Sequence, residues 1–137
     1  MKICAAGILI KDNRILLGKR SSDRKFYPDV WDLIGGHCEG NETPEQTLSR
    51  ELNEEIGVTP TKIIPIAVLQ DPESVIHGDY EYHIYLVTNW IGSPINLSTN
   101  EHSELLWFEI EDATKLSLAH PKYIELFKTL RNDRGKQ

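Results

Sequence analysis

The chain has 137 residues, of which 39% are hydrophobic and 26% are charged, as expected for one soluble globular domain over residues 1–137. Its formal net charge of −6 argues against a nucleic-acid polymer as a partner, because a polyphosphate backbone requires a basic surface. The apolar runs are too short for a transmembrane helix, so we expect no membrane partner. The two cysteines, Cys4 and Cys38, lack CxxC spacing and fit reduced thiols in a cytoplasmic protein.

Strands and helices alternate along the chain. In chain order we predict strands at 3–10, 14–19 and 31–34, a helix at 44–56, strands at 62–69, 80–90 and 105–110, a short helix at 111–116 and a final helix that Pro121 opens. Asp12-Asn13 is a plausible hairpin turn, and Pro65 predicts a bulge or an edge position for its strand. Two polar segments, 20–29 and 71–79, are predicted loops. This alternation predicts an α/β fold.

The helix at 44–56 has start and stop signals at its ends. Thr43 can cap its N-terminus, and Pro44 suits the first helical position. Gln46 stands where a capping box requires it, and Gly57 is a stop signal. The buried face of the helix is predicted by apolar residues that recur every four positions: Leu48, Leu52 and Ile56.

Three glutamates share another side of this helix. Glu51, Glu54 and Glu55 stand at positions i, i+3 and i+4, so their carboxylates project together. Like charges at this spacing destabilise an isolated helix, and a hard cation such as Mg²⁺ or Mn²⁺ would remove that penalty. The simpler interpretation is a solvated acidic face.

The segment from Gly36 to Val58 reads GHCEGNETPEQTLSRELNEEIGV. It contains glycine, five residues, glutamate, seven residues, Arg-Glu-aliphatic, one residue, Glu-Glu, one residue and Gly-aliphatic. This pattern resembles the box of the Nudix hydrolases, which use divalent metal to cleave the diphosphate bond of a nucleoside diphosphate linked to another group. The resemblance implies the Nudix fold, a mixed β-sheet sandwiched between helices. Dimers are common in this family, so a homodimer is a further expectation.

The resemblance also implies a set of metal ligands. These are Glu51, Glu54 and Glu55, which would hold Mg²⁺ or Mn²⁺, with the carbonyl of Gly35 as an additional ligand. Arg50 is expected to orient a carboxylate through a bidentate contact.

A late loop often supplies a further carboxylate in MutT-type members of the family. Glu101 is the first choice for a general base or an additional metal ligand, with Glu104 and His102 as alternatives. The catalytic set implied by the resemblance is therefore Glu54, Glu101 and Arg50.

Three residues are predicted to bind substrate. Arg20 stands where MutT-like members have an arginine that meets a phosphate. His37 follows the glycines of the box and is either a phosphate contact or a hydrogen-bonded structural histidine. His120 stands near the purine-reading asparagine of the bacterial enzyme. We interpret Arg24 and Lys25 as ordinary surface charges.

The chain looks most like the MutT-type nucleoside triphosphate pyrophosphohydrolases, which release a nucleoside monophosphate and pyrophosphate. Ile34 and His120 depart from the residues of that subgroup and argue against a specific 8-oxo-dGTP assignment. Pro72 lies near a proline of the ADP-ribose hydrolases, so ADP-ribose or a dinucleoside polyphosphate is an alternative small-molecule substrate. A non-catalytic nucleotide-sensing module is the alternative of another class, although such modules often lose the glutamates that this box keeps.

Overall fold

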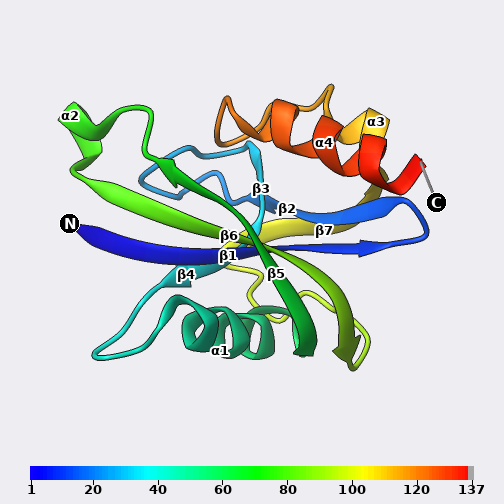
Figure 1. The fold of residues 1–137 in the computed structure, drawn as a ribbon. Helices are drawn as coiled ribbons and strands as arrows, with labels where there is room; N and C mark the ends of the chain where they lie inside the picture. The colour runs from blue at the N-terminus through cyan, green and yellow to red at the C-terminus, as the bar shows by residue number, and fades with distance from the viewer. Residues whose placement is uncertain (136–137) are drawn as a thin grey trace.

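A seven-stranded mixed sheet lies between two layers of helices, as Figure 1 shows for the computed structural model, which describes residues 1–135 with side chains up to Arg131. The strands are β1 (Lys2–Lys11), β2 (Arg14–Arg20), β3 (Trp31–Asp32), β4 (Ile34–His37), β5 (Thr59–Gln70), β6 (Tyr80–Ile91) and β7 (His102–Glu109). The helices are α1 (Pro44–Ile56), α2 (Ser74–His77), α3 (Ile110–Ala113) and α4 (Tyr123–Gly135). The expected mixed sheet between helices is confirmed.

Strand β1 organises the sheet. The strand order is β3-β2-β1-β6-β5, with β4 paired to β1 and β7 paired to β2. β1 is parallel to β6 and antiparallel to β2 and β4. The predicted hairpin turn is confirmed, since Asp12 and Asn13 have φ values of 54° and 63°, as a tight two-residue turn requires. The edge position and irregularity of β5 are also confirmed by the register shift between Pro65 and Ala67.

Helix α1 covers one face of the sheet with its predicted capping box and apolar stripe. The Thr43 hydroxyl accepts a hydrogen bond from the N–H of Gln46, and the Gln46 side chain accepts one from the N–H of Thr43. Gly57 ends the helix with a φ of 72° in the left-handed region. The stripe is fully buried in the core cluster on this face: Leu48, Leu52 and Ile56. This packing fixes which side of α1 remains for the glutamates.

Helices α3 and α4 cover the other face (Figure 1). Ile110 and Ala113 of α3 pack with Phe127 and Leu130 of α4 in a second buried cluster, which includes residues of β1 and β2. Helix α4 begins at Tyr123, two residues after Pro121, where we predicted its start, and extends to Gly135. Among the described helices of residues 1–135, none combines the length and the apolar character needed to cross a membrane.

The structure corrects several boundaries, among them the start of β5 at Thr59 instead of 62 and the end of α3 at Ala113 instead of 116. The strand predicted at 31–34 is two strands separated at Leu33, because β3 pairs with β2 whereas β4 pairs with β1. The predicted loop 71–79 contains α2. Strand β7 begins at His102, three residues earlier than predicted, because Arg20 at the end of β2 pairs with it across a register shift.

Candidate active site

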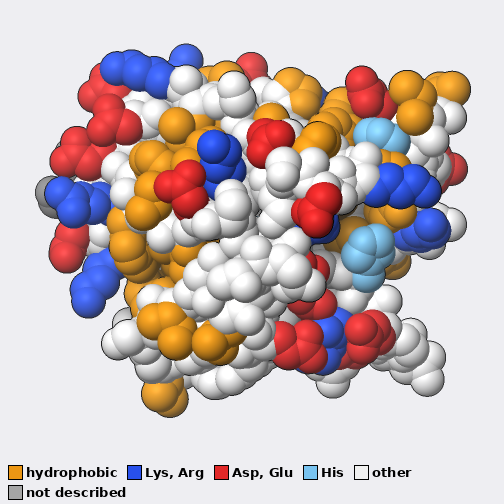
Figure 2. Space-filling view, turned by 180° about the vertical axis from the view of Figure 1, so that it is seen from behind, with side chains coloured by type: hydrophobic (Ala, Val, Ile, Leu, Met, Phe, Trp, Pro, Cys, Tyr) orange, Lys and Arg blue, Asp and Glu red, His pale blue; other side chains and the backbone are white. Residues whose placement is uncertain are grey.

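Arg50 joins the carboxylates on the exposed side of α1. Its Nε donates to Oε2 of Glu42 at 2.7 Å and its Nη2 donates to Oε1 of the same carboxylate at 2.9 Å. Its Nη1 donates to Glu51 at 2.8 Å and to Glu54 at 3.2 Å. Hydrogen bonds from Arg50, and then from the backbone of Glu39, lower the pKa of Glu42 to about 2. Figure 2 shows acidic side chains on both sides of a basic one on the lower part of the molecule, the level at which α1 lies in Figure 1.

Glu51 and Glu54 share a nitrogen of Arg50 but differ in exposure. The Glu51 side chain is 14% exposed, and the Glu54 side chain is 59% exposed. Glu51 lies against β4, where a Cβ atom on Gly36 would come within 2.5 Å of its carboxylate carbon. Glycine at this position therefore makes room for the carboxylate. Gly35 and Glu51 line the same pocket, and Glu54 is outside its lining.

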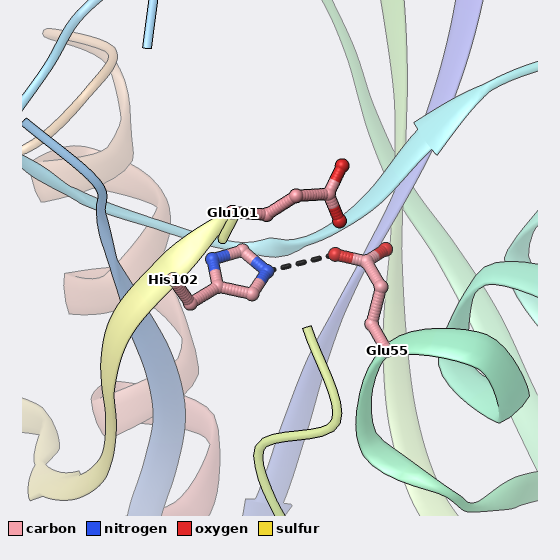
Figure 3. A group of neighbouring side chains, drawn as sticks. All are labelled: Glu55, Glu101 and His102. Carbon is pink, nitrogen blue, oxygen red and sulfur yellow. Dashed lines mark hydrogen bonds and ion pairs between the residues drawn. The ribbon is translucent and has the colours of Figure 1, made fainter. Parts of the chain in front are cut away.

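Glu55, Glu101 and His102 form a compact cluster, drawn in Figure 3. Glu55 comes from α1, whereas Glu101 and His102 come from the start of β7 and the turn before it. The Nε2 of His102 lies 2.7 Å from Oε1 of Glu55, and both residues are buried. The Glu101 carboxylate points toward that of Glu55. The structure thus brings together one box glutamate, the predicted late-loop glutamate and its histidine alternative.

The chemistry of this cluster fits a divalent cation. One ligand atom from each of the three residues lies within 4.8 Å of the others. The Oε2 of Glu55 is buried without a hydrogen-bond partner among the described residues. The Nδ1 of His102 also lacks one there, but it faces Gly18 on the side of the ring away from Glu55. Burial, and then the neighbouring carboxylates of Glu51 and Glu101, raise the pKa of Glu55 far above its usual range. Burial lowers the pKa of His102, which favours the neutral imidazole.

A pocket of about 360 Å³ opens beside the cluster. Its lining combines three kinds of side chain. The acidic group contains Asp32, Glu39, Glu51, Glu55 and Glu101. The basic group contains Arg20, Arg24, Lys25 and His37. The third group, which we call the aromatic wall, contains Phe26, Tyr27, Tyr80 and Tyr82.

The three predicted substrate-binding residues all line this pocket. Arg20 uses its guanidinium within the protein, donating to the carbonyls of Phe26 and Tyr27 and to Asp32 at distances of 2.8–3.1 Å. His37 is exposed, its ring meets that of Tyr80 edge-on, and its backbone carbonyl accepts from Arg50.

His120 is buried, and both of its ring nitrogens have partners. Nδ1 accepts from the backbone N–H of Lys122, so Nε2 carries the proton and donates to the carbonyl of Gln70 at 2.7 Å. His120 therefore lines the pocket with its ring and not with an unpaired ring nitrogen. An edge-on contact with Tyr82 and a stacked contact with Tyr123 hold that ring in place.

Sequence reasoning missed the pocket residues of the loop between β2 and β3. Arg24 and Lys25, interpreted as surface charges, both line the pocket, as do the next two residues, Phe26 and Tyr27. The Nη1 of Arg24 lies 3.5 Å from the carbonyl of Glu101, next to the carboxylate cluster. The sequence signal that could have indicated these pocket residues is a pair of basic residues followed by a pair of aromatic residues within a polar loop.

Several known proteins resemble this chain. A family model described as NUDIX domain matches residues 1–130. The CTP pyrophosphohydrolase of Escherichia coli K12 is 32% identical over 130 residues, covering 92% of this chain and 90% of that protein. The ADP-ribose pyrophosphatase of Methanocaldococcus jannaschii is 28% identical over 130 residues, covering 95% of this chain and 75% of that protein. The solution structure of the Escherichia coli ORF135 protein matches with a TM-score of 0.78 at 29% identity, covering 100% of this chain and 93% of that one.

Proposed function

The chain belongs to the Nudix family of hydrolases, and on that premise we propose that it is a nucleoside triphosphate pyrophosphohydrolase that requires Mg²⁺ or Mn²⁺. Hydrolysis of a nucleoside diphosphate-linked substrate is the chemistry of the family. The observation that carries the finer proposal is the composition of the pocket. Carboxylates for metal, basic side chains for phosphates and an aromatic wall for a base line one cavity of about 360 Å³. The products would be a nucleoside monophosphate and pyrophosphate.

The metal would be held by oxygen ligands from two segments. Glu51, Glu54 and Glu55 would supply carboxylates from α1, and Gly35 would add its carbonyl from β4. The bound cation would neutralise phosphate charge and lower the pKa of the attacking water. Arg50 holds Glu51 and Glu54 in place through its Nη1.

Glu101 is the proposed general base. Its carboxylate would accept a proton from the water that attacks phosphorus. The neutral imidazole of His102 holds Glu55 through the 2.7 Å contact between Nε2 and Oε1. Because His102 follows Glu101 in the chain, this contact keeps Glu55 at a fixed distance from Glu101.

Arg24, Lys25 and His37 are the proposed phosphate contacts, because they line the pocket and carry donors. Arg20 acts on the same phosphates chiefly by shaping the loop that carries Arg24 and Lys25. Its three hydrogen-bonded nitrogens are bound to that loop and to Asp32.

A hydrolysis screen with product identification tests the proposed function. The purified protein is incubated with canonical and oxidised nucleoside triphosphates, ADP-ribose, dinucleoside polyphosphates and nucleotide sugars, with Mg²⁺, with Mn²⁺ and with excess EDTA. We expect release of pyrophosphate from one or a few triphosphates, abolished by EDTA. A protein that binds nucleotides but cleaves no member of the panel would contradict the proposal and favour a sensing module.

ADP-ribose is a second candidate substrate for a specific reason. Pro72 lines the pocket, and the relative from Methanocaldococcus jannaschii is named an ADP-ribose pyrophosphatase. Cleavage of ADP-ribose to AMP and ribose 5-phosphate in the same screen, without release of pyrophosphate from triphosphates, would select this substrate over the first.

A further inference from the structure

Asp71 is a buried carboxylate that joins three segments around the pocket. It follows β5 directly, and its side chain is 0% exposed. The hydroxyl of Tyr27 donates to Oδ1 at 2.9 Å, and the hydroxyl of Tyr82 donates to Oδ2 at 2.7 Å. The N–H of Glu73 donates to Oδ1 at 2.7 Å, and Nδ1 of His77 lies 3.3 Å from the same oxygen. One side chain thus connects the loop before β3, helix α2 and strand β6.

The bonds to Asp71 favour its ionised form. Burial alone would raise the pKa of this carboxyl, but the hydrogen bonds from Tyr82, Glu73, Tyr27 and His77 outweigh burial and lower it. Hydrogen bonds to an ionised acceptor are stronger than those between neutral groups. The ionised Asp71 therefore holds the three segments together through strong hydrogen bonds.

Two members of the aromatic wall are held directly by Asp71, and a third is held through His77. The His77 ring stacks on Phe26 with a centroid distance of 4.0 Å and meets Tyr27 edge-on at 5.0 Å. Tyr82 stacks in parallel with Tyr80, at a centroid distance of 6.1 Å. Asp71 itself is outside the pocket lining, so any effect on a ligand passes through these rings.

The loop that carries Phe26 and Tyr27 needs such support. Tyr27 and Asp29 have φ values of 50° and 63°, in the left-handed region that disfavours residues with a Cβ. Strained backbone of this kind persists when surrounding contacts fix it, and it is concentrated at functional sites. The Tyr27 hydroxyl bond to Asp71 is a side-chain contact that fixes this turn, alongside the bonds from Arg20 to the loop carbonyls.

We propose that Asp71 is a positioning residue for nucleoside recognition, which acts by fixing Tyr27, Tyr82 and, through His77, Phe26 as a rigid surface for the base. This inference rests on the proposed function, because it assumes that the aromatic wall receives the nucleoside. Aromatic rings that are already in place bind a stacked base without a further ordering cost. Asp71 has no direct contact with the carboxylate cluster, because none of its hydrogen bonds reaches Glu55, Glu101 or His102.

Kinetics of Asp71→Asn and Tyr27→Phe test the inference. The substrate is the nucleoside triphosphate that the parent protein cleaves with the highest kcat/KM, and inorganic tripolyphosphate is a competing ligand that has no base. Since hydrogen bonds to a charged group are the strong ones, we expect KM to rise about 10-fold or more in Asp71→Asn and somewhat less in Tyr27→Phe, with kcat within about threefold of the parent. The inhibition constant of tripolyphosphate should rise less than KM, because this ligand meets the basic side chains of the loop but has no base to stack on the aromatic wall.

Tyr85→Phe is the matched control. The Tyr85 hydroxyl donates to Glu45 at 2.7 Å, which is the same chemistry, and neither residue lines the pocket. This variant loses a comparable tyrosine–carboxylate bond and should keep the parent KM. Equal rises of KM in Tyr85→Phe and Tyr27→Phe would reduce the effect to general loosening of the fold and overturn the proposal.

Limited trypsin digestion gives a readout that needs no substrate. Arg24 and Lys25 lie in the loop that Asp71 holds through Tyr27, so we expect faster cleavage after these residues in Asp71→Asn and Tyr27→Phe than in the parent or in Tyr85→Phe. If Asp71→Asn does not fold, Tyr27→Phe carries both tests. A parent that cleaves no nucleotide refutes the proposed function, whereas unchanged trypsin cleavage or a fall in kcat with constant KM refutes the role of Asp71.

Discussion

Glu101 and Glu104 are three residues apart and have different surroundings. Glu101 lines the pocket and points toward Glu55, whereas Glu104 is 49% exposed and faces Lys19 at 3.9 Å. Because a general base is expected to contribute about 100-fold or more, Glu101→Gln should lower kcat by at least that factor, and Glu104→Gln should leave it near the parent value. Steady-state kinetics and thermal melting of both variants check this. A Glu101→Gln protein with parental kcat would remove Glu101 from the mechanism.

Gly35 and Gly36 are adjacent, and a methyl group on each would meet a different obstacle. At Gly36 it would displace the carboxylate at the end of the Glu51 side chain, whereas at Gly35 it would overlap the backbone oxygen of Ala5 in β1. We expect Gly36→Ala to lower kcat/KM at least about 10-fold while its free energy of unfolding changes by less than about 1 kcal/mol. In Gly35→Ala the free energy of unfolding should fall by about 2 kcal/mol or more.

Urea denaturation combined with kinetics distinguishes these two glycine variants. Loss of activity in Gly36→Ala that is fully explained by loss of folded protein would contradict the assigned role of Glu51.

At the scale of an element, α1 depends on an ion pair with the loop before it. The pKa of Glu42 falls from 4.5 to about 2 on folding, chiefly through Arg50. A lowered pKa means that the ionised form is preferred in the folded protein. Its stabilising contribution is therefore complete above about pH 4.5 and is lost as the pH falls toward 2.

The pH dependence of stability in a Glu42→Gln variant measures this contribution. We expect the parent to exceed the variant in free energy of unfolding by a constant amount above pH 4.5, and the difference to shrink toward pH 2. Urea denaturation at several pH values provides the data. A difference that is the same at low and neutral pH would show that Glu42 acts without its charge.

Elements whose signals are local could be predicted from sequence. The cap at Thr43, the left-handed stop at Gly57 and the turn at Asp12-Asn13 each depend on neighbouring residues, and all three are confirmed. The strand break at Leu33 and the early start of β7 depend on which distant strand is the partner, information that a single strand does not carry. The apolar pattern also gives no sign of α2, whose four residues are all at least partly exposed.

The site divides in the same way. The box places Glu51, Glu54 and Glu55 on one helix, so their proximity could be predicted. The approach of Glu101 and His102 to Glu55 depends on a contact across 47 positions of the chain for His102. The role of Asp71 had no signal, because its partners Tyr27 and Tyr82 lie 44 and 11 positions away.

At the scale of the whole molecule, divalent cations should stabilise the fold. The chain carries a net charge of −6, and Glu55 is buried with an oxygen that lacks a partner among the described residues. A ligand at 100 times its dissociation constant adds about 2.7 kcal/mol, so we expect Mg²⁺ or Mn²⁺ to raise the melting temperature by about 5 °C or more over NaCl of equal ionic strength.

Glu55→Gln is the variant that tests the origin of this stabilisation. It removes a buried carboxylate from the cluster, so it should melt at or above the parent without divalent cations and gain less when they are added. A rise in melting temperature that is identical in parent and variant would place the stabilising ion elsewhere on the surface.

The aromatic wall is built by segments 21–30 and 71–82, whereas Glu51, Glu54 and Glu55 stand on α1, which packs on the sheet through its own core cluster. The loop before β3 can therefore accept new residues without disturbing the packing of α1. Under natural selection, a duplicated copy of such a gene could acquire a new substrate by changes in one short surface loop, while the bond that it breaks stays the same. Descendants that share every glutamate of the box can thus differ in what they consume.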